Sequence, residues 1–205
     1  MLQYITDNES RRGVVDQVRE VLSAGCGWIQ VTTDHLSDDQ IRKIIDQIMP
    51  ICQEKEAFLT FRDRVALAKE INVGGVVVSE GGEFPSHARA ALGAAAIVGV
   101  EASDTDRIAS LKGLDVDYVA LRPFRQIPGC DTAPLGLDGI RTLCDFMEEK
   151  ELEFPRVATG GVTNDDIRAL MEAGCNGVAM SEAIADASDM AEATARAMAL
   201  IRGDE

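Results

Sequence analysis

Two adjacent glycines form the candidate with the clearest chemistry in this chain. Gly160 and Gly161 follow a short apolar run, and paired glycines there let backbone N–H groups approach an anion without side-chain obstruction. A second segment ends in Met180 and Ser181 and leads into a short helical pattern, whose N-terminus favours an anion. We therefore predict a phosphate site formed by Gly160, Gly161, Met180 and Ser181. A tight turn without a ligand is the alternative that the same pattern permits.

Three arginines near the ends of predicted strands could bring positive charge to an anionic ligand. Arg122 and Arg125 follow one apolar run, and Arg62 follows another. In α/β barrels the carboxyl ends of the strands surround the mouth where active sites lie. One interpretation is an anion clamp in which Arg122 is the first candidate. The other is a set of surface ion pairs with the plentiful carboxylates, which would contribute little.

Cys130 lies in a loop, residues 126–134, that is rich in proline and glycine and long enough to act as a lid. A cysteine becomes a good nucleophile when its surroundings lower its pKa, so Cys130 is a candidate catalytic residue and, alternatively, a bystander thiol. The chain has 5 cysteines, dispersed and without a CxxC pair. Such a set is typical of reduced thiols rather than of a disulfide framework.

Alternating apolar runs and amphipathic stretches supply the frame for these residues. The predicted strands are Leu2–Thr6, Trp28–Thr32, Phe58–Phe61, Gly75–Val78, Ala96–Val100, Tyr118–Leu121, Arg156–Thr159 and Gly177–Met180. Between them, apolar residues recur with the 3.6-residue period of helices. Eight such units predict a parallel α/β fold. The glycine turn after the seventh strand favours a closed (β/α)₈ TIM barrel, with residues 1–205 as a single domain, over an open doubly wound sheet.

Composition narrows the classes of partner. The net charge of −15 disfavours nucleic acid and anionic membrane surfaces as partners. No apolar run reaches the length of about 18 residues that spanning a membrane requires. The first residues carry no signal-peptide pattern, and we therefore expect a cytoplasmic protein. An anionic substrate would have to meet a local positive pocket that overcomes the global negative field.

Segments along most of the chain resemble one enzyme family. They are Gln3–Asp7, Gly27–Gln30, Asp63–Ala68, Asp117–Ala120, Leu135–Ile140 and the two glycine segments described above. In this order they are similar to thiamin phosphate synthase and its paralogue thiazole tautomerase, TenI. The resemblance implies a barrel that joins hydroxymethylpyrimidine diphosphate to thiazole phosphate. It also implies that Mg²⁺ and cationic side chains neutralise the departing diphosphate.

Several positions depart from the pattern of that family. Thr32–Asp34 stands where the family has Arg-Glu-Lys, so two cations are missing and one charge is inverted. The resemblance assigns Asp63 to Mg²⁺ and to catalysis, while the second metal carboxylate falls at Gly82, beside Glu83. The histidine expected for tautomerase catalysis falls near Ser103. The departures therefore concentrate on the catalytic residues, and the phosphate cradle is kept.

We expect a thiamin-phosphate-synthase-like transferase of thiamin biosynthesis that binds a phosphorylated thiazole or thiamin phosphate at the barrel mouth, with Mg²⁺ if it is active. One alternative is a non-catalytic paralogue that binds the same small phosphorylated heterocycle as a carrier, sensor or partner. Another is a thiazole tautomerase or other barrel isomerase that uses Glu101, Asp63 or His35 as acid or base. The oligomeric state stays open, and a homodimer is one option.

Overall fold

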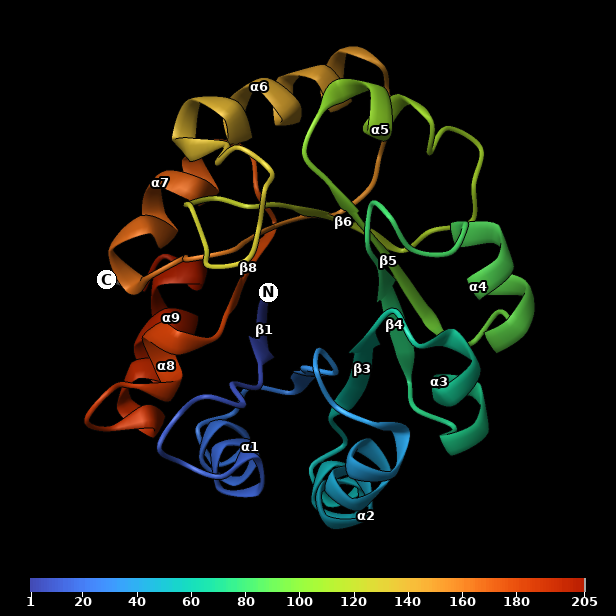
Figure 1. The fold of residues 1–205 in the computed structure, drawn as a ribbon. Helices are drawn as coiled ribbons and strands as arrows, with labels where there is room; N and C mark the ends of the chain where they lie inside the picture. Colours follow the sequence, from blue (N-terminus) through green and yellow to red (C-terminus); the bar gives the residue numbers. More distant parts are fainter. Residues whose placement is uncertain (205) are drawn as a thin grey trace.

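The computed structural model describes residues 1–204, and their strands form one closed parallel barrel in the order β1 to β8 (Figure 1). The strands are β1 (Leu2–Ile5), β2 (Trp28–Val31), β3 (Phe58–Arg62), β4 (Gly75–Val78), β5 (Ile97–Ala102), β6 (Tyr118–Leu121), β7 (Arg156–Thr159) and β8 (Gly177–Met180). The first strand pairs with the last, which closes the sheet. The predicted (β/α)₈ barrel is confirmed, and each strand overlaps its predicted range.

Helices surround the barrel as a ring (Figure 1). They are α1 (Val14–Ser23), α2 (Asp38–Glu54), α3 (Val65–Ile71), α4 (Pro85–Leu92), α5 (Thr105–Ala109), α6 (Gly136–Glu149), η1 (Asn164–Asp166), α7 (Ile167–Glu172), α8 (Glu182–Ala185) and α9 (Met190–Arg202). Local sequence explains where the long helix α2 begins, because Ser37 and Gln40 form a capping box of two reciprocal hydrogen bonds. No helix within residues 1–204 is long and apolar enough to cross a membrane.

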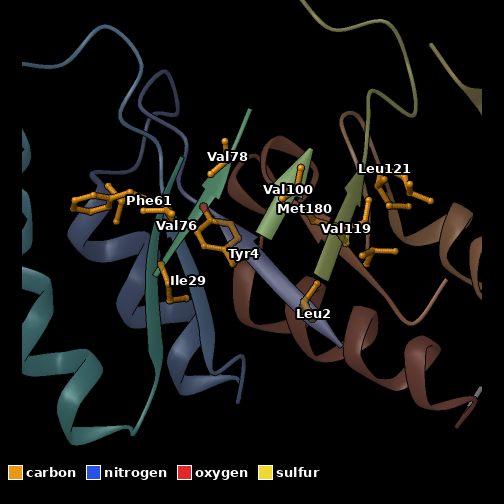
Figure 2. Packing of buried hydrophobic residues seen from close by; sticks show 14 of the residues in the cluster. Leu2, Tyr4, Ile29, Phe61, Val76, Val78, Val100, Val119, Leu121 and Met180 are labelled. Atoms are coloured by element: carbon orange, nitrogen blue, oxygen red, sulfur yellow. The ribbon is translucent and has the colours of Figure 1, made fainter. Parts of the chain in front are cut away.

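Side chains alternate along each strand between the helix-facing side and the barrel interior, as the two-residue period of a strand requires. The helix-facing positions carry large apolar residues, which pack beneath the helices and form the main core (Figure 2). Examples are Tyr4, Ile29, Phe61, Val100 and Met180, each of which is almost completely buried. Because both faces of the strands are covered, the strands are near-continuous apolar runs, which made them recognisable in the sequence.

Inward-facing side chains of the strands fill the part of the barrel interior that lies farther from the carboxyl ends of the strands. A small cluster of Val77, Tyr118, Ala120, Val157 and Ala179 packs there. Tyr118 fits because its neighbour in the sheet is Gly99, where a Cβ would overlap the tyrosine ring. Burial raises the pKa of the Tyr118 phenol, which therefore stays neutral. The inward-facing polar residues at the carboxyl ends of the strands are left to build a site.

Candidate functional site

A cavity of about 920 Å³ opens at the carboxyl ends of the strands. The loops that follow β1, β2, β6, β7 and β8 line it, together with inward-facing residues of the strands. A smaller cavity of about 440 Å³ lies at the opposite end of the barrel, around Trp28, Phe58 and Tyr118, and is almost wholly apolar. Specific binding of a small molecule needs several well-placed polar groups, so the larger cavity at the mouth is the candidate site.

The predicted glycine cradle forms one wall of this cavity. Gly160 and Gly161 line it and adopt positive φ angles of 88° and 76°. Each also lies close to the loop after β6: a Cβ on Gly160 would be 3.0 Å from Pro123 Cα, and one on Gly161 would be 3.0 Å from Arg125 Cβ. Both the backbone conformation and the lack of space therefore require glycine at these two positions.

Unused backbone donors gather beside these glycines. Within residues 1–204, the N–H groups of Gly161, Val162, Glu182 and Ala183 donate to no protein acceptor. All four residues line the cavity, as does Ser181 at the start of α8. An anion in the cavity would supply acceptors for these N–H groups. The arrangement can bind a phosphate.

Arg125 braces the glycine turn from outside the cavity. Its Nη1 donates to the carbonyl oxygen of Gly161 at 2.6 Å, and its guanidinium makes two hydrogen bonds of 2.5 Å to Asp166. Asp166 also accepts from the N–H and the hydroxyl of Thr163. Burial works to raise the pKa of the Asp166 carboxyl, but the hydrogen bonds from Arg125 and Thr163 hold that pKa below its usual value. Arg125 is therefore engaged in shaping the turn.

A second brace comes from the loop after β1. Arg12 donates from Nη1 to the carbonyl oxygen of Ala185 at 2.8 Å and from Nη2 to that of Ser188 at 3.1 Å. These carbonyl groups belong to the end of α8 and the turn that follows it. Arg12 therefore ties the loop after β1 to the short helix whose first residues line the cavity.

Two arginines, Arg62 and Arg122, contact the carboxylate of Glu101 inside the mouth of the barrel. Arg62 donates to both carboxylate oxygens of Glu101, from Nε at 2.8 Å and from Nη2 at 3.0 Å. Arg122 donates from Nη1 to the same two oxygens at 3.1 and 3.0 Å. The Glu101 side chain is only 7% exposed, against 25% for Arg62 and 20% for Arg122. The hydrogen bond with Glu101, and less so its charge, raises the pKa of Arg62.

Strand geometry explains why these three residues meet. Arg62 and Glu101 occupy inward-facing positions near the carboxyl ends of β3 and β5, and Arg122 follows β6 directly. Alternate strands of a (β/α)₈ barrel contribute side chains to the same interior layer, so residues far apart in sequence become neighbours. Of the two interpretations of Arg122, an isolated surface ion pair does not fit, because its partner carboxylate is buried.

Asp63 and Glu83 do not form the metal site that the resemblance implies. The Oδ1 atom of Asp63 accepts the backbone N–H of Ser79 at 2.9 Å and lies against Gly82, where a Cβ would overlap it. Neither Asp63 nor Glu83 is among the residues that line the cavity, and Glu83 is exposed. Within residues 1–204 no group of three or more His, Cys, Asp or Glu side chains could hold a metal ion. Neither carboxylate is therefore placed to hold Mg²⁺ against a substrate in the cavity.

The remaining predicted residues are placed differently from one another. Met180 packs in the buried apolar core (Figure 2) and is not among the residues that line the cavity. Cys130 is half-buried in the loop after β6, and its neighbours Ile127 and Pro128, but not Cys130, line the cavity. His35 lines the rim of the cavity and adopts a left-handed backbone conformation with a φ of 62°. Ser181 and the two glycines are therefore the predicted cradle residues that the fold brings together.

The sequence predicts Glu101 only as a possible acid or base, not as a carboxylate held between two arginines. Arg12 and Asp166 are not among the predicted site residues. A usable signal existed for Glu101, since a charged residue at an inward-facing position of an otherwise apolar strand must find a partner. Thr163 and Asp166 have the spacing of a capping box, which predicts the local hydrogen bonds of Asp166. The contacts that Arg12 and Arg125 make between loops have no comparable pattern in the sequence.

Comparisons with known proteins add an independent line of observation. The model of a family described as thiamine monophosphate synthase matches residues 2–184. A thiamine-phosphate synthase of Bacteroides fragilis (strain YCH46) is 35% identical over 197 residues, which cover 95% of this chain and 97% of the relative. One of Flavobacterium johnsoniae is 30% identical over 190 residues, which cover 92% of this chain and 90% of the relative.

Solved structures agree on the fold. A thiamine phosphate pyrophosphorylase from Pyrococcus furiosus superposes with a TM-score of 0.85, covering 98% of this chain and 95% of that one. The two sequences are 23% identical, so this similarity concerns the architecture. The family is shown instead by the matching family model and by the relatives that are similar in sequence.

Proposed function

The chain belongs to the thiamine monophosphate synthase family, and from this premise we propose that it acts in thiamin biosynthesis by binding a phosphorylated thiazole at the barrel mouth. The thiazole phosphate would serve as the acceptor for a pyrimidine diphosphate, and thiamin phosphate would be the product. The relatives that cover almost the whole chain are thiamine-phosphate synthases, which supports a transferase over an unrelated barrel enzyme.

The wall of unused backbone donors carries this proposal. The N–H groups of Gly161, Val162, Glu182 and Ala183 line one side of a cavity large enough for a small heterocycle. Backbone N–H groups concentrated in this way bind the oxygens of a phosphate without needing a cationic side chain. This matters in a chain with a net charge of −15, because the cradle attracts an anion through local dipoles at short range.

The side chains of this mouth would bind and orient rather than transfer protons. The cradle would hold the phosphate of the thiazole and fix the position of its ring. Arg122 would face the anionic end of the second substrate, and cations placed there stabilise charge that develops on a leaving group. The rate gain would come from orientation and from electrostatic stabilisation, which are the effects that fixed donors can supply.

A second candidate function is a non-catalytic paralogue that binds the phosphorylated heterocycle without coupling it. Asp34, which stands where the family has a cation, lines the cavity and lies 3.5 Å from Arg62 Nη1. This carboxylate works against a diphosphate at that place. It therefore favours binding over turnover.

The isomerase alternative has less support. Glu101, its best candidate for an acid or base, accepts four hydrogen bonds from two arginines. A general base needs a free lone pair within reach of the substrate proton, and these bonds occupy the carboxylate. Asp63 is engaged with Ser79 and lies outside the cavity lining, which leaves His35 as the remaining candidate.

Calorimetric titration with thiazole phosphate tests the proposal, followed by addition of hydroxymethylpyrimidine diphosphate and an assay for thiamin phosphate. Saturable binding followed by product formation is the expected result. Binding without product would select the paralogue, and no binding would reject both. Gly161→Ala should weaken binding of the thiazole phosphate, whereas Gly113→Ala, a second positive-φ glycine with open space around it, should not.

A further inference from the structure

Arg122 lines the cavity and has hydrogen-bond donors without a partner in the described residues. Its two bonds to Glu101 both come from Nη1, and within residues 1–204 its Nε and Nη2 have no partner. Neither atom is among the buried side-chain atoms that lack a hydrogen bond, so both are open to solvent. An arginine with Nε and Nη2 free presents two parallel N–H groups, which match two oxygens of a phosphate.

Arg62 cannot offer the same edge. Its Nε and Nη2 are both bound to Glu101, and its Nη1 lies 3.5 Å from Asp34. Arg62 instead neutralises the buried carboxylate, so that the charge of Arg122 is not cancelled by Glu101. The three side chains together carry one net positive charge in the wall of the cavity. The carboxylate also fixes the Arg122 guanidinium through two hydrogen bonds, which lowers the entropy that ligand binding would cost.

We propose that Arg122, held in place by the Arg62–Glu101 ion pair, is a second phosphate-binding point of the mouth and binds a phosphate or diphosphate group without a metal ion. The proposal departs from the Mg²⁺ that the resemblance implies, because Asp63 and Glu83 do not assemble a metal site while a fixed guanidinium is present. The inference rests on the proposed function in one respect: the glycine cradle is assigned to the phosphate of the other ligand, thiazole phosphate. Arg62 and Glu101 are positioning residues in this arrangement.

Acidic residues around the cavity would repel a bound phosphate. Asp7, Glu9, Asp34 and Glu182 are also among the lining residues. Asp34 is 54% exposed, and exposed charges are screened over about 8 Å at physiological ionic strength. A phosphate bound directly by Arg122 would be in hydrogen-bond contact with it, and charge-assisted hydrogen bonds of this kind are the strong ones. The contact with Arg122 should therefore outweigh the repulsion. The acidic residues should lower the affinity for phosphate without abolishing binding.

Calorimetric titration with inorganic pyrophosphate, in EDTA and again with excess Mg²⁺, is the first test. We expect saturable binding in EDTA. Arg122→Met should lower the affinity at least about 10-fold, the loss expected for a hydrogen bond to a charged group. Arg64→Met is the matched control: it removes the same charge, but Arg64 pairs with Asp38 and does not line the cavity. Binding that requires Mg²⁺, or unchanged affinity in Arg122→Met, would overturn the proposal, the latter by placing pyrophosphate in the glycine cradle.

The positioning role of Arg62 has its own readout. The Arg122 Nε–H resonance, assigned by through-bond correlations from the Arg122 backbone, should shift when pyrophosphate is added to the wild-type protein. It should also shift in the ligand-free Arg62→Met variant, whose pyrophosphate affinity should fall, while Arg62→Lys should keep most of that affinity. A resonance that ignores pyrophosphate in the wild type would overturn the proposal even if Arg122→Met failed to fold.

Thiazole phosphate binding, measured separately, keeps the two proposals distinguishable. Pyrophosphate binding that depends on Arg122 in a protein that ignores thiazole phosphate would reject the proposed function and leave this inference standing. Thiazole phosphate binding with no effect of Arg122 on pyrophosphate would do the reverse.

Discussion

Arg62 and Glu101 form a two-point ion pair at the barrel mouth, with Nε 2.8 Å from Oε1 and Nη2 3.0 Å from Oε2. The two residues are 39 positions apart in the chain and belong to strands that are not neighbours in the sheet. The pair therefore spans β4 and forms only when these three strands are assembled. It also places a buried carboxylate where Arg122 can bind it, and the consequences for stability and binding can be measured.

Glu101→Gln should destabilise the protein by about 1–3 kcal/mol, because the amide leaves two arginines with unsatisfied donors and mutually repelling charges. Urea unfolding at neutral pH measures the loss. Glu70→Gln provides the control, since Glu70 pairs with Arg42 at 3.0 Å but its side chain is 63% exposed. Exposed pairs contribute about 0–1 kcal/mol, so the control should change little. Equal effects of the two substitutions would show that the Glu101 cluster is not a buried unit.

Gly160→Ala should cost more stability than Gly113→Ala. Both glycines have positive φ angles, 88° and 80°, and an alanine in that region costs about 1–2 kcal/mol. At Gly160 the new Cβ would also lie 3.0 Å from Pro123 Cα, whereas at Gly113 it would meet nothing within 4 Å. Thermal unfolding of the two variants separates the steric part from the conformational part. Equal losses of stability in both variants would mean that the loop after β6 moves to accommodate the new Cβ at little cost.

Asp166→Asn should remove part of the acid sensitivity of the protein. The pKa of Asp166 is held below its usual value of about 3.9, so its contribution to stability is present above that pH and is lost as the pH falls through the folded-state pKa. The variant should therefore be less stable than the wild type at neutral pH, and the difference should shrink below about pH 4. Urea unfolding across this pH range measures it. Asp46→Asn is the control, because it removes the same charge at an exposed position of α2 and should change the stability little.

Cys130 should be the thiol that reacts fast in the native protein. It is half-buried, whereas Cys26, Cys52, Cys144 and Cys175 are buried. Burial raises the pKa of Cys52 to about 11, which lowers its thiolate population further. Titration with a chromogenic disulfide should show one rapid equivalent per chain, which Cys130→Ser should abolish and Cys175→Ser should retain. A rapid equivalent that persists in Cys130→Ser would refute this assignment.

The same Cys130→Ser variant decides between the two roles considered for this residue. Unchanged binding of thiazole phosphate and unchanged thiamin phosphate formation would identify a bystander. Loss of product with binding intact would identify a catalytic thiol.

The sequence by itself determined the barrel and the glycine cradle. Strands such as Gly75–Val78 are apolar throughout because helices cover one face and the barrel interior the other, and this requirement is written into consecutive residues. The glycine cradle could also be predicted from the sequence, because Gly160 and Gly161 adopt positive φ angles, which is a local property of the backbone.

Only the tertiary structure decided which charged residues meet. Arg122 and Glu101 are 21 positions apart, and nothing local says that both face inward at the same height of the barrel. The family resemblance assigns Asp63 to a metal ion, yet Asp63 lies outside the cavity lining and its Oδ1 accepts the Ser79 N–H of the next loop. Pairing between polar side chains depends on which partner lies within about 3 Å after the sheet has closed. Backbone patterns depend on residues close together in the sequence, whereas the pairing of polar side chains depends on residues that come from different strands of the barrel.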